Sequence, residues 1–87
     1  MRKKIHVTIE VDISVDETKF TDPFINEFRQ KFYPLDYLND HICNLSEQYA
    51  LGYISPSDSI IEGYGKPENF GIKFHSKDVE NVEIQGE

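Results

Sequence analysis

KIHVTIEVDISV, residues 4–15, alternates strictly between polar and β-branched apolar side chains. Its apolar members are Ile5, Val7, Ile9, Val11, Ile13 and Val15. Successive side chains of a strand point to opposite faces, so the stretch predicts one long strand with an apolar face and a polar face. β-Branched residues also favour a pleated, half-buried surface. The rest of the chain is therefore expected to cover the apolar face.

Length and charge indicate a small acidic domain. The 87 residues suffice for a single modest core, so we expect residues 1–87 to form one domain. The net charge is −7, from 16 acidic and 9 basic residues. This balance argues against direct binding to nucleic acid or to an anionic membrane, and it permits a basic protein as partner.

Cysteine usage and hydropathy indicate a cytoplasmic protein. Cys43 is the single cysteine, which excludes a disulfide within the chain and fits a reducing compartment. We expect it at or near the core. No apolar run approaches the ~20 residues of a membrane span, and the basic start Met1–Lys4 lacks the apolar region of a signal peptide.

Two helices are expected after the first strand. The first, over residues 21–33, starts at Thr21 or Asp22 as N-cap and ends before Pro34. The second starts at Asp36 as N-cap, and Gly52 ends it. Each has one apolar stripe, formed by Phe24, Phe28 and Phe32 in the first and by Leu38, Ile42, Leu45 and Tyr49 in the second. The short connection predicts antiparallel neighbours whose stripes cover the strand.

The last third of the chain predicts two or three short strands. Residues 60–64 fit either a strand or one helical turn, residues 70–75 alternate as a strand, and residues 76–80 are expected to turn the chain. Residues 81–85 form the last strand, followed by a frayed end at Gly86 and Glu87.

The predicted fold class is α+β in the order β-α-α-β-β-β. Two antiparallel helices are expected on one face of a three- or four-stranded, mainly antiparallel sheet. In this arrangement Ile9, Phe28 and Ile42 should be nearly fully buried and close together.

The sequence offers little catalytic chemistry. His41 and Cys43 are two apart on a helix and point to different sides, and there is no Cys-x-x-Cys. Residues 63–66, GYGK, lack the spacing of a phosphate-binding loop. We therefore expect a non-enzymatic protein without metal or cofactor. One enzymatic alternative stays open, in which His6, Asp12 and His75 share the polar sheet face as a general base site.

The candidate binding surface is acidic and carries tyrosines, a residue type enriched at protein interfaces. Tyr33, Tyr37, Tyr53 and Tyr64 cannot all be buried in a chain of this size. The candidate partner-binding residues are Asp36, Tyr37, Asp40, Glu47, Asp58 and Glu62. Such a patch could dock against a basic groove, although a half-exposed core edge would look the same. The last strand could also pair with a copy of itself through Val82 and Ile84, so monomer and homodimer both stay open.

The resemblance of this chain to known proteins lies in two segments, KFTDPFINEFRQKFYPLDYLNDHICNLSEQYALG (19–52) and IIEGYGKPENFGIKF (60–74). The second resembles a tail pattern of small uncharacterised proteins of phages and other mobile elements. In type, the chain is similar to acidic phage-encoded inhibitors of host defence such as anti-CRISPR proteins. The resemblance implies an inhibitor that occupies the nucleic-acid groove of a basic effector protein by mimicry. Its motif is structural, so it implies no catalytic residue.

Overall fold

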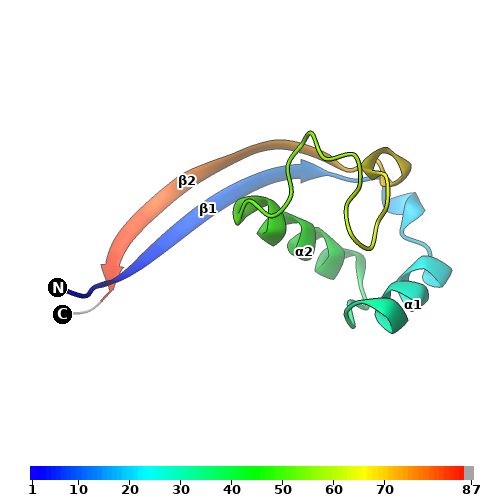
Figure 1. Cartoon of the computed structure of the whole chain (residues 1–87), viewed down its shortest axis with the longest axis horizontal. Coiled ribbons are helices and arrows are strands. Elements are labelled where there is room, and N and C mark those ends of the chain that lie inside the picture. The colour runs from blue at the N-terminus through cyan, green and yellow to red at the C-terminus, as the bar shows by residue number, and fades with distance from the viewer. Residues whose placement is uncertain (86–87) are drawn as a thin grey trace.

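The computed structural model describes residues 1–85, as a two-stranded antiparallel ribbon with a helical body at one end (Figure 1). Its elements are β1 (Lys4–Ser14), a 3₁₀ turn η1 (Glu17–Lys19), α1 (Asp22–Lys31), α2 (Leu38–Ala50), a second 3₁₀ turn η2 (Pro67–Phe70) and β2 (Lys73–Gln85). The predicted frayed end, Gly86 and Glu87, lies outside the described residues. The ribbon projects beyond the body and makes the molecule elongated, with extents of 49 × 25 × 18 Å.

The sheet of residues 1–85 has two strands, so the predicted three- or four-stranded sheet is wrong, while the broader α+β class is correct. The order of helices and strands is β-α-α-β. The difference arises at residues 76–80, where we expected a turn and β2 runs straight through. This segment contains neither glycine nor proline, and the strand absorbs its irregular apolar spacing by bulging instead of turning.

Two register shifts in the β1–β2 ladder adjust that spacing. Thr8 pairs with Asn81 and Ile9 with Val79, so Glu80 is an extra residue in β2. A second shift lies between Asp12 and Ile13, next to the base of the ribbon. A bulge changes the alternation of faces by one residue. The shifts therefore place Val79 opposite Ile9 and Phe74 opposite Ile13.

Local signals place the helices close to the predicted ranges, although α1 ends at Lys31 instead of residue 33. The Thr21 hydroxyl caps α1 by accepting a hydrogen bond from the Phe24 N–H at 3.4 Å. The N-cap of α2 is Tyr37 rather than Asp36, and the Asp40 carboxylate accepts a hydrogen bond from the Tyr37 N–H at 3.2 Å. Gly52 follows α2 with a φ of +80°, the left-handed conformation that favours glycine.

Residues 60–64 form neither of the two structures that the sequence left open. Ile61 and Gly65 form an isolated antiparallel bridge, in which the Ile61 N–H donates to the Gly65 carbonyl at 2.8 Å. The segment between them is a tight loop, and Gly63 within it has a φ of +88°. This loop places Ile61 and Tyr64 in the core, where they are 1% and 4% exposed.

The core is largely aromatic and lies in the body. Phe28, His41 and Tyr64 pack against one another, with ring centroids between 4.8 and 5.7 Å apart. The His41 Nδ1 and the Tyr64 hydroxyl share a buried hydrogen bond of 2.8 Å. Burial raises the pKa of Tyr64 to about 12. Tyr64 is thus a neutral core residue.

The predicted trio of core residues is only partly correct. Phe28 is buried, whereas Ile9 is 39% exposed and Ile42 is half-buried. The side chains of α2 that enter the core are His41, Leu45 and Tyr49. Leu45 and Tyr49 of the predicted stripe are thus confirmed, and His41 takes the place of Ile42. Cys43, expected at or near the core, is exposed.

The helices cover only one end of the sheet. In Figure 1, α2 lies along the base of the ribbon, and α1 lies beyond the ribbon's end. The prediction that both helical stripes cover the strand is therefore wrong, because the ribbon is longer than the body. Val11, Ile13 and Phe74 at its base pack against the core, whereas no such cover over the distal half of the apolar face is found among residues 1–85.

Candidate functional site

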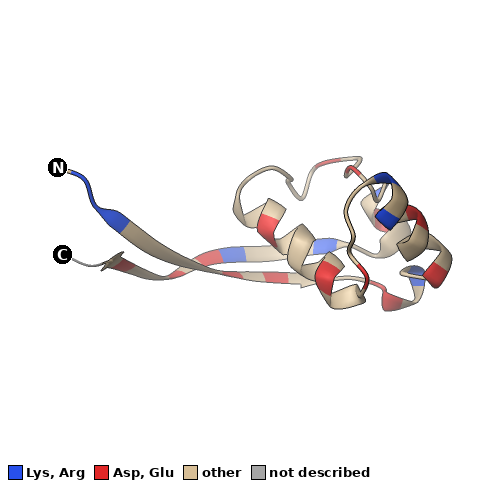
Figure 2. Cartoon of the chain, turned by 90° about the horizontal axis from the view of Figure 1, so that it is seen from below, with Lys and Arg blue, Asp and Glu red and all other residues tan. Residues whose placement is uncertain are grey.

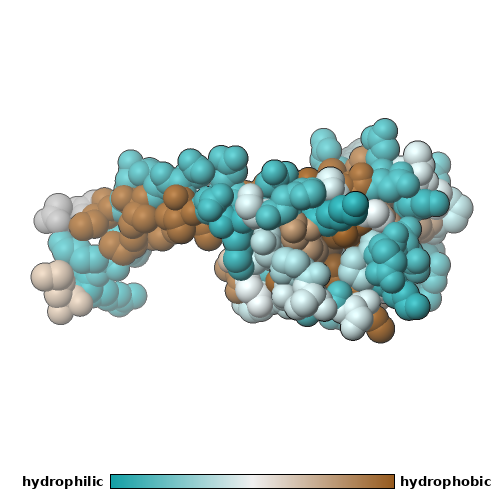
Figure 3. All heavy atoms as spheres, turned by 90° about the horizontal axis from the view of Figure 1, so that it is seen from above, coloured by the Kyte–Doolittle hydropathy of each residue, from teal (hydrophilic) through white to brown (hydrophobic). Residues whose placement is uncertain are grey.

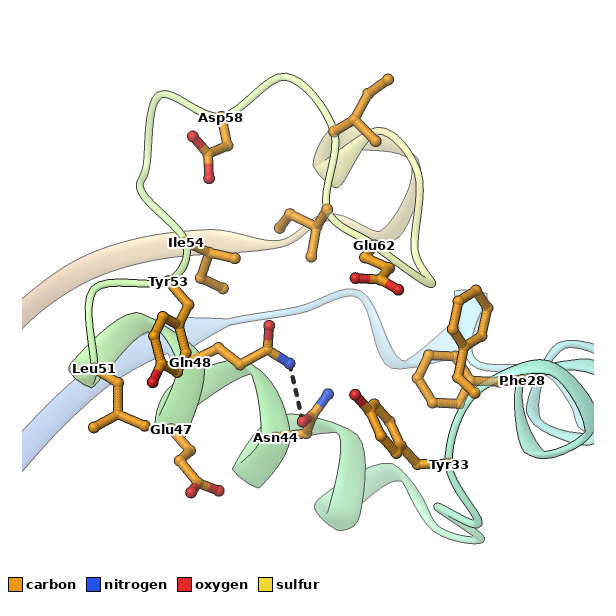
Figure 4. Close-up of a pocket in the computed structure, with 13 residues that line it drawn as sticks. Phe28, Tyr33, Asn44, Glu47, Gln48, Leu51, Tyr53, Ile54, Asp58 and Glu62 are labelled. Carbon is orange, nitrogen blue, oxygen red and sulfur yellow. Dashed lines mark hydrogen bonds between the residues drawn. The ribbon is translucent and has the colours of Figure 1, made fainter.

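Three of the six predicted site residues line one cavity. Glu47 comes from α2, while Asp58 and Glu62 come from the loop that follows it, and all three border a cavity of about 510 Å³ (Figure 4). The exposed residues Tyr33 and Tyr53 line the same cavity. The structure thus brings three of the predicted carboxylates together with two tyrosines, whereas Tyr37, the tyrosine of the predicted site, lies elsewhere.

The other three predicted residues lie outside this cavity and have local roles. Asp36 forms an ion pair with Arg29, with 2.9 Å between its Oδ1 and the arginine Nε. Asp40 is engaged with the N–H of Tyr37 at the start of α2. The Tyr37 side chain is 71% exposed. These residues therefore do not belong to the cavity site.

The loop over residues 51–62 forms one wall because two of its apolar side chains are buried. Its first turn continues from α2, with the Tyr53 N–H donating to the Gln48 carbonyl at 2.9 Å. Ile54 and Ile61, 8% and 1% exposed, fix the loop onto the core. Asp58 is held in place by accepting a hydrogen bond from the Ser55 N–H at 3.0 Å. The two loop carboxylates are thereby positioned across from α2.

Polar side chains of α2 form the opposite wall. The Gln48 amide donates to the Asn44 side-chain oxygen at 3.0 Å. In Figure 4 the Glu62 carboxylate and the Tyr33 hydroxyl point toward the middle of the cavity, whereas Glu47 points outward from the rim. The cavity thus has an interior acceptor and an acidic rim.

The electrostatics of the cavity favour a cation. None of its lining residues is lysine, arginine or histidine, while three are carboxylic acids. Within residues 1–85 no group of three or more histidine, cysteine, aspartate or glutamate residues is arranged to hold a metal ion. The carboxylates are spread over the cavity, with Glu62 directed inward and Glu47 at the rim, which suits an extended cationic side chain or segment better than a bare ion.

The enzymatic alternative is not assembled by the sheet. His6 pairs with Glu83, while His75 lies beside the register shift at Asp12–Ile13. Seven positions along β1 at about 3.3 Å each separate the two histidines by roughly 20 Å. His75 instead shares a hydrogen bond of 3.0 Å with the Ser14 hydroxyl. A shared general base site on the polar face is therefore excluded by distance.

Sequence reasoning missed several residues of the cavity. Leu51 and Ile60 line it and are 58% and 69% exposed. Asn44 and Gln48 line it as well, and their i,i+4 spacing was the available signal for a polar wall on α2. The exposed apolar pair could not be recognised from sequence, because single apolar residues occur both in cores and on surfaces.

Comparisons of the chain with protein families, with curated proteins and with solved structures each found no match. Within residues 1–85, no helix combines the length and apolar character needed to cross a bilayer.

Proposed function

We propose that this chain is a non-enzymatic protein-binding module whose acidic cavity docks a basic surface of another protein. The observation that carries the proposal is the lining of the cavity, which has three carboxylates, two exposed tyrosines and no basic residue. Carboxylates attract lysine and arginine, and tyrosine rings add cation–π contacts and contact area. The net charge of −7 draws a basic partner from a distance.

The partner class that we propose is a basic, nucleic-acid-binding protein. Its nucleic-acid groove presents spaced lysine and arginine side chains, which the rim carboxylates of the cavity can pair with as phosphates do. An acidic module docked there excludes nucleic acid. The role that follows is that of a phage or mobile-element inhibitor of a host defence effector, acting by nucleic-acid mimicry. The acidic charge and the type of protein support this role.

A charge-matched pair of variants tests the cavity. The variant with Glu47→Gln and Glu62→Gln removes two cavity charges, while Glu17→Gln with Glu68→Gln removes two exposed charges outside it. Binding of a fluorescent arginine-rich peptide at low salt should weaken about five- to tenfold in the first variant, as expected for two rim ion pairs. It should change little in the second. Equal weakening in both variants would show that only net charge matters.

The role as an inhibitor needs a separate experiment. The wild-type chain and the cavity variant serve as bait in host lysate at low and high salt. We expect a basic nucleic-acid-binding protein that is captured by the wild type, released by salt and displaced by its own nucleic acid. A partner that is neither basic nor nucleic-acid-binding, or binding that is indifferent to salt, contradicts mimicry.

A further inference from the structure

The distal half of the ribbon carries an uncovered apolar face. Its residues are Ile5, Val7 and Ile9 on β1 and Val79, Val82 and Ile84 on β2, and they are between 39% and 64% exposed. They form three cross-strand pairs in the order Ile5–Ile84, Val7–Val82 and Ile9–Val79. Figure 3 shows a continuous hydrophobic patch along the ribbon, away from the body. We call these six residues the ribbon face.

The shape of β2 maintains this face. Val79 and Val82 are three residues apart, so on a regular strand they would point to opposite sides of the sheet. The extra residue Glu80 restores the alternation, and both valines then oppose apolar residues of β1. The bulge thus extends the apolar face over a part of the ribbon that α2 does not reach.

We propose that the ribbon face binds the same face of a second copy of this chain, giving a two-fold symmetric homodimer. The two ribbons would stack as the two layers of a small β-sandwich, about 10 Å apart. A symmetric interface must be complementary to itself, and a pleated β-branched surface with no charged side chain meets this condition. Stacking also supplies what an isolated two-stranded ribbon lacks, a second apolar layer.

The area is sufficient for a dimer. The six side chains expose roughly 500 Å² of apolar surface, which matches the largest patches of typical monomers at about 300–600 Å². Two such faces would bury about 1,000 Å² before their rims are included, close to the ~1,200–2,000 Å² of stable complexes. None of the six residues lines the acidic cavity, so dimerisation leaves both cavities open and does not depend on the proposed function.

Charged side chains of the ribbon lie outside the ribbon face. The tip carries Arg2, Lys3 and Lys4, and the part nearer the body carries Glu10 and Asp78 as a cross-strand pair (Figure 2). Glu10 alternates with Ile9 along β1, so this pair lies on the polar face of the ribbon, opposite to the ribbon face. Stacking two ribbon faces therefore leaves these carboxylates exposed to solvent.

The test measures molecular mass by light scattering after gel filtration, from about 1 to 100 μM. The expected mass rises toward twice the 10.1 kDa of one chain at the upper end of this range. Val7→Lys, in the centre of the ribbon face, should give a monomer. Thr8→Lys, one residue along on the opposite face and paired with Asn81, should remain a dimer. Circular dichroism checks that each variant is folded, and Val7→Thr, which keeps the shape of valine, replaces Val7→Lys if that variant unfolds.

Three outcomes would overturn the proposal. A wild-type chain that is monomeric at 100 μM has no such interface. Dimers of both lysine variants would place the contact elsewhere, for instance at a strand edge, where side-chain direction matters little. A mass that grows with concentration beyond two copies would indicate an open, non-symmetric contact.

Discussion

Gly63→Ala tests how the loop between Ile61 and Gly65 packs on the core. A Cβ at residue 63 would lie 2.5 Å from Cε2 of Phe28, whose side chain is only 3% exposed. The φ of +88° adds strain for any L-residue. Left-handed backbone strain costs about 1–2 kcal/mol, and overpacking a buried ring adds about 1–3 kcal/mol. We therefore expect the free energy of unfolding to fall by roughly 2–5 kcal/mol.

Gly65→Ala is the matched control. Gly65 also has a positive φ, +72°, but a Cβ there would have no heavy atom within 4 Å. Its substitution should therefore cost only the backbone strain, about 1–2 kcal/mol. Urea denaturation of both variants measures the difference directly. Since 87 residues typically give about 4–13 kcal/mol of total stability, the loss in Gly63→Ala is large.

A double-mutant cycle isolates the contact itself. Phe28→Leu removes the ring atoms that a Cβ at residue 63 would meet. Gly63→Ala should then cost less in the Phe28→Leu background than in the wild type, with a coupling energy of about 1 kcal/mol or more. Equal costs for Gly63→Ala and Gly65→Ala, together with no coupling to Phe28, would refute this packing.

Three further predictions concern stability. Burial lowers the pKa of His41 from its ordinary 6.5, with smaller opposing effects from the Leu35 backbone and Asp40. The unfolded chain therefore binds a proton more readily than the folded one. The free energy of unfolding should be at its full value above pH 6.5 and fall below that pH. Urea midpoints at pH 8 and pH 5.5 measure this loss, which should be smaller in His41→Gln. Leu45→Ala, at a side chain with 0% exposure, should lower the free energy of unfolding by about 2–5 kcal/mol. Ile9→Ala should lower it clearly less. Both are measured by denaturant unfolding at submicromolar concentration, where the monomer dominates. Thr21→Ala removes the N-cap of α1 and should lower the free energy of unfolding by about 1 kcal/mol. An unchanged free energy of unfolding would show that the cap contributes nothing.

Local chemistry explains which parts of the fold were predictable from the sequence. The alternation of residues 4–15 predicts β1, Thr21 with Pro23 predicts the start of α1, and Gly52 predicts the end of α2. Each signal acts within a few residues, so tertiary packing does not overrule it. The single long β2 was missed because its bulges break the alternation. The lack of glycine and proline in residues 76–80 was the signal against a turn.

Tertiary partners explain what the sequence could not predict. Toward the start of α2, the stripe through Leu45 and Tyr49 can include either His41 or Ile42. The hydrogen bond between His41 and Tyr64 favours burial of His41. The alternation of β1 predicts an apolar face but not how far the body reaches along it.

The placement of the predicted site residues also depends on tertiary partners. Glu47, Asp58 and Glu62 come together because the burial of Ile54 and Ile61 folds the loop back beside α2. Asp36 and Asp40 were also acidic and exposed in the sequence pattern. Their short-range partners, Arg29 and the Tyr37 N–H, are apparent only in three dimensions.

The central claim is that the acidic cavity binds a basic segment, and an NMR titration with an arginine-rich peptide tests it most directly. With ¹⁵N-labelled protein at low salt, we expect saturable amide shifts concentrated in residues 44–62, including Gln48, Tyr53 and Glu62. The shifts should disappear at high salt, because the pairs are exposed to solvent. Shifts spread evenly over all acidic surfaces, or centred on Glu10 and Glu83 of the ribbon, would contradict the cavity as the binding site.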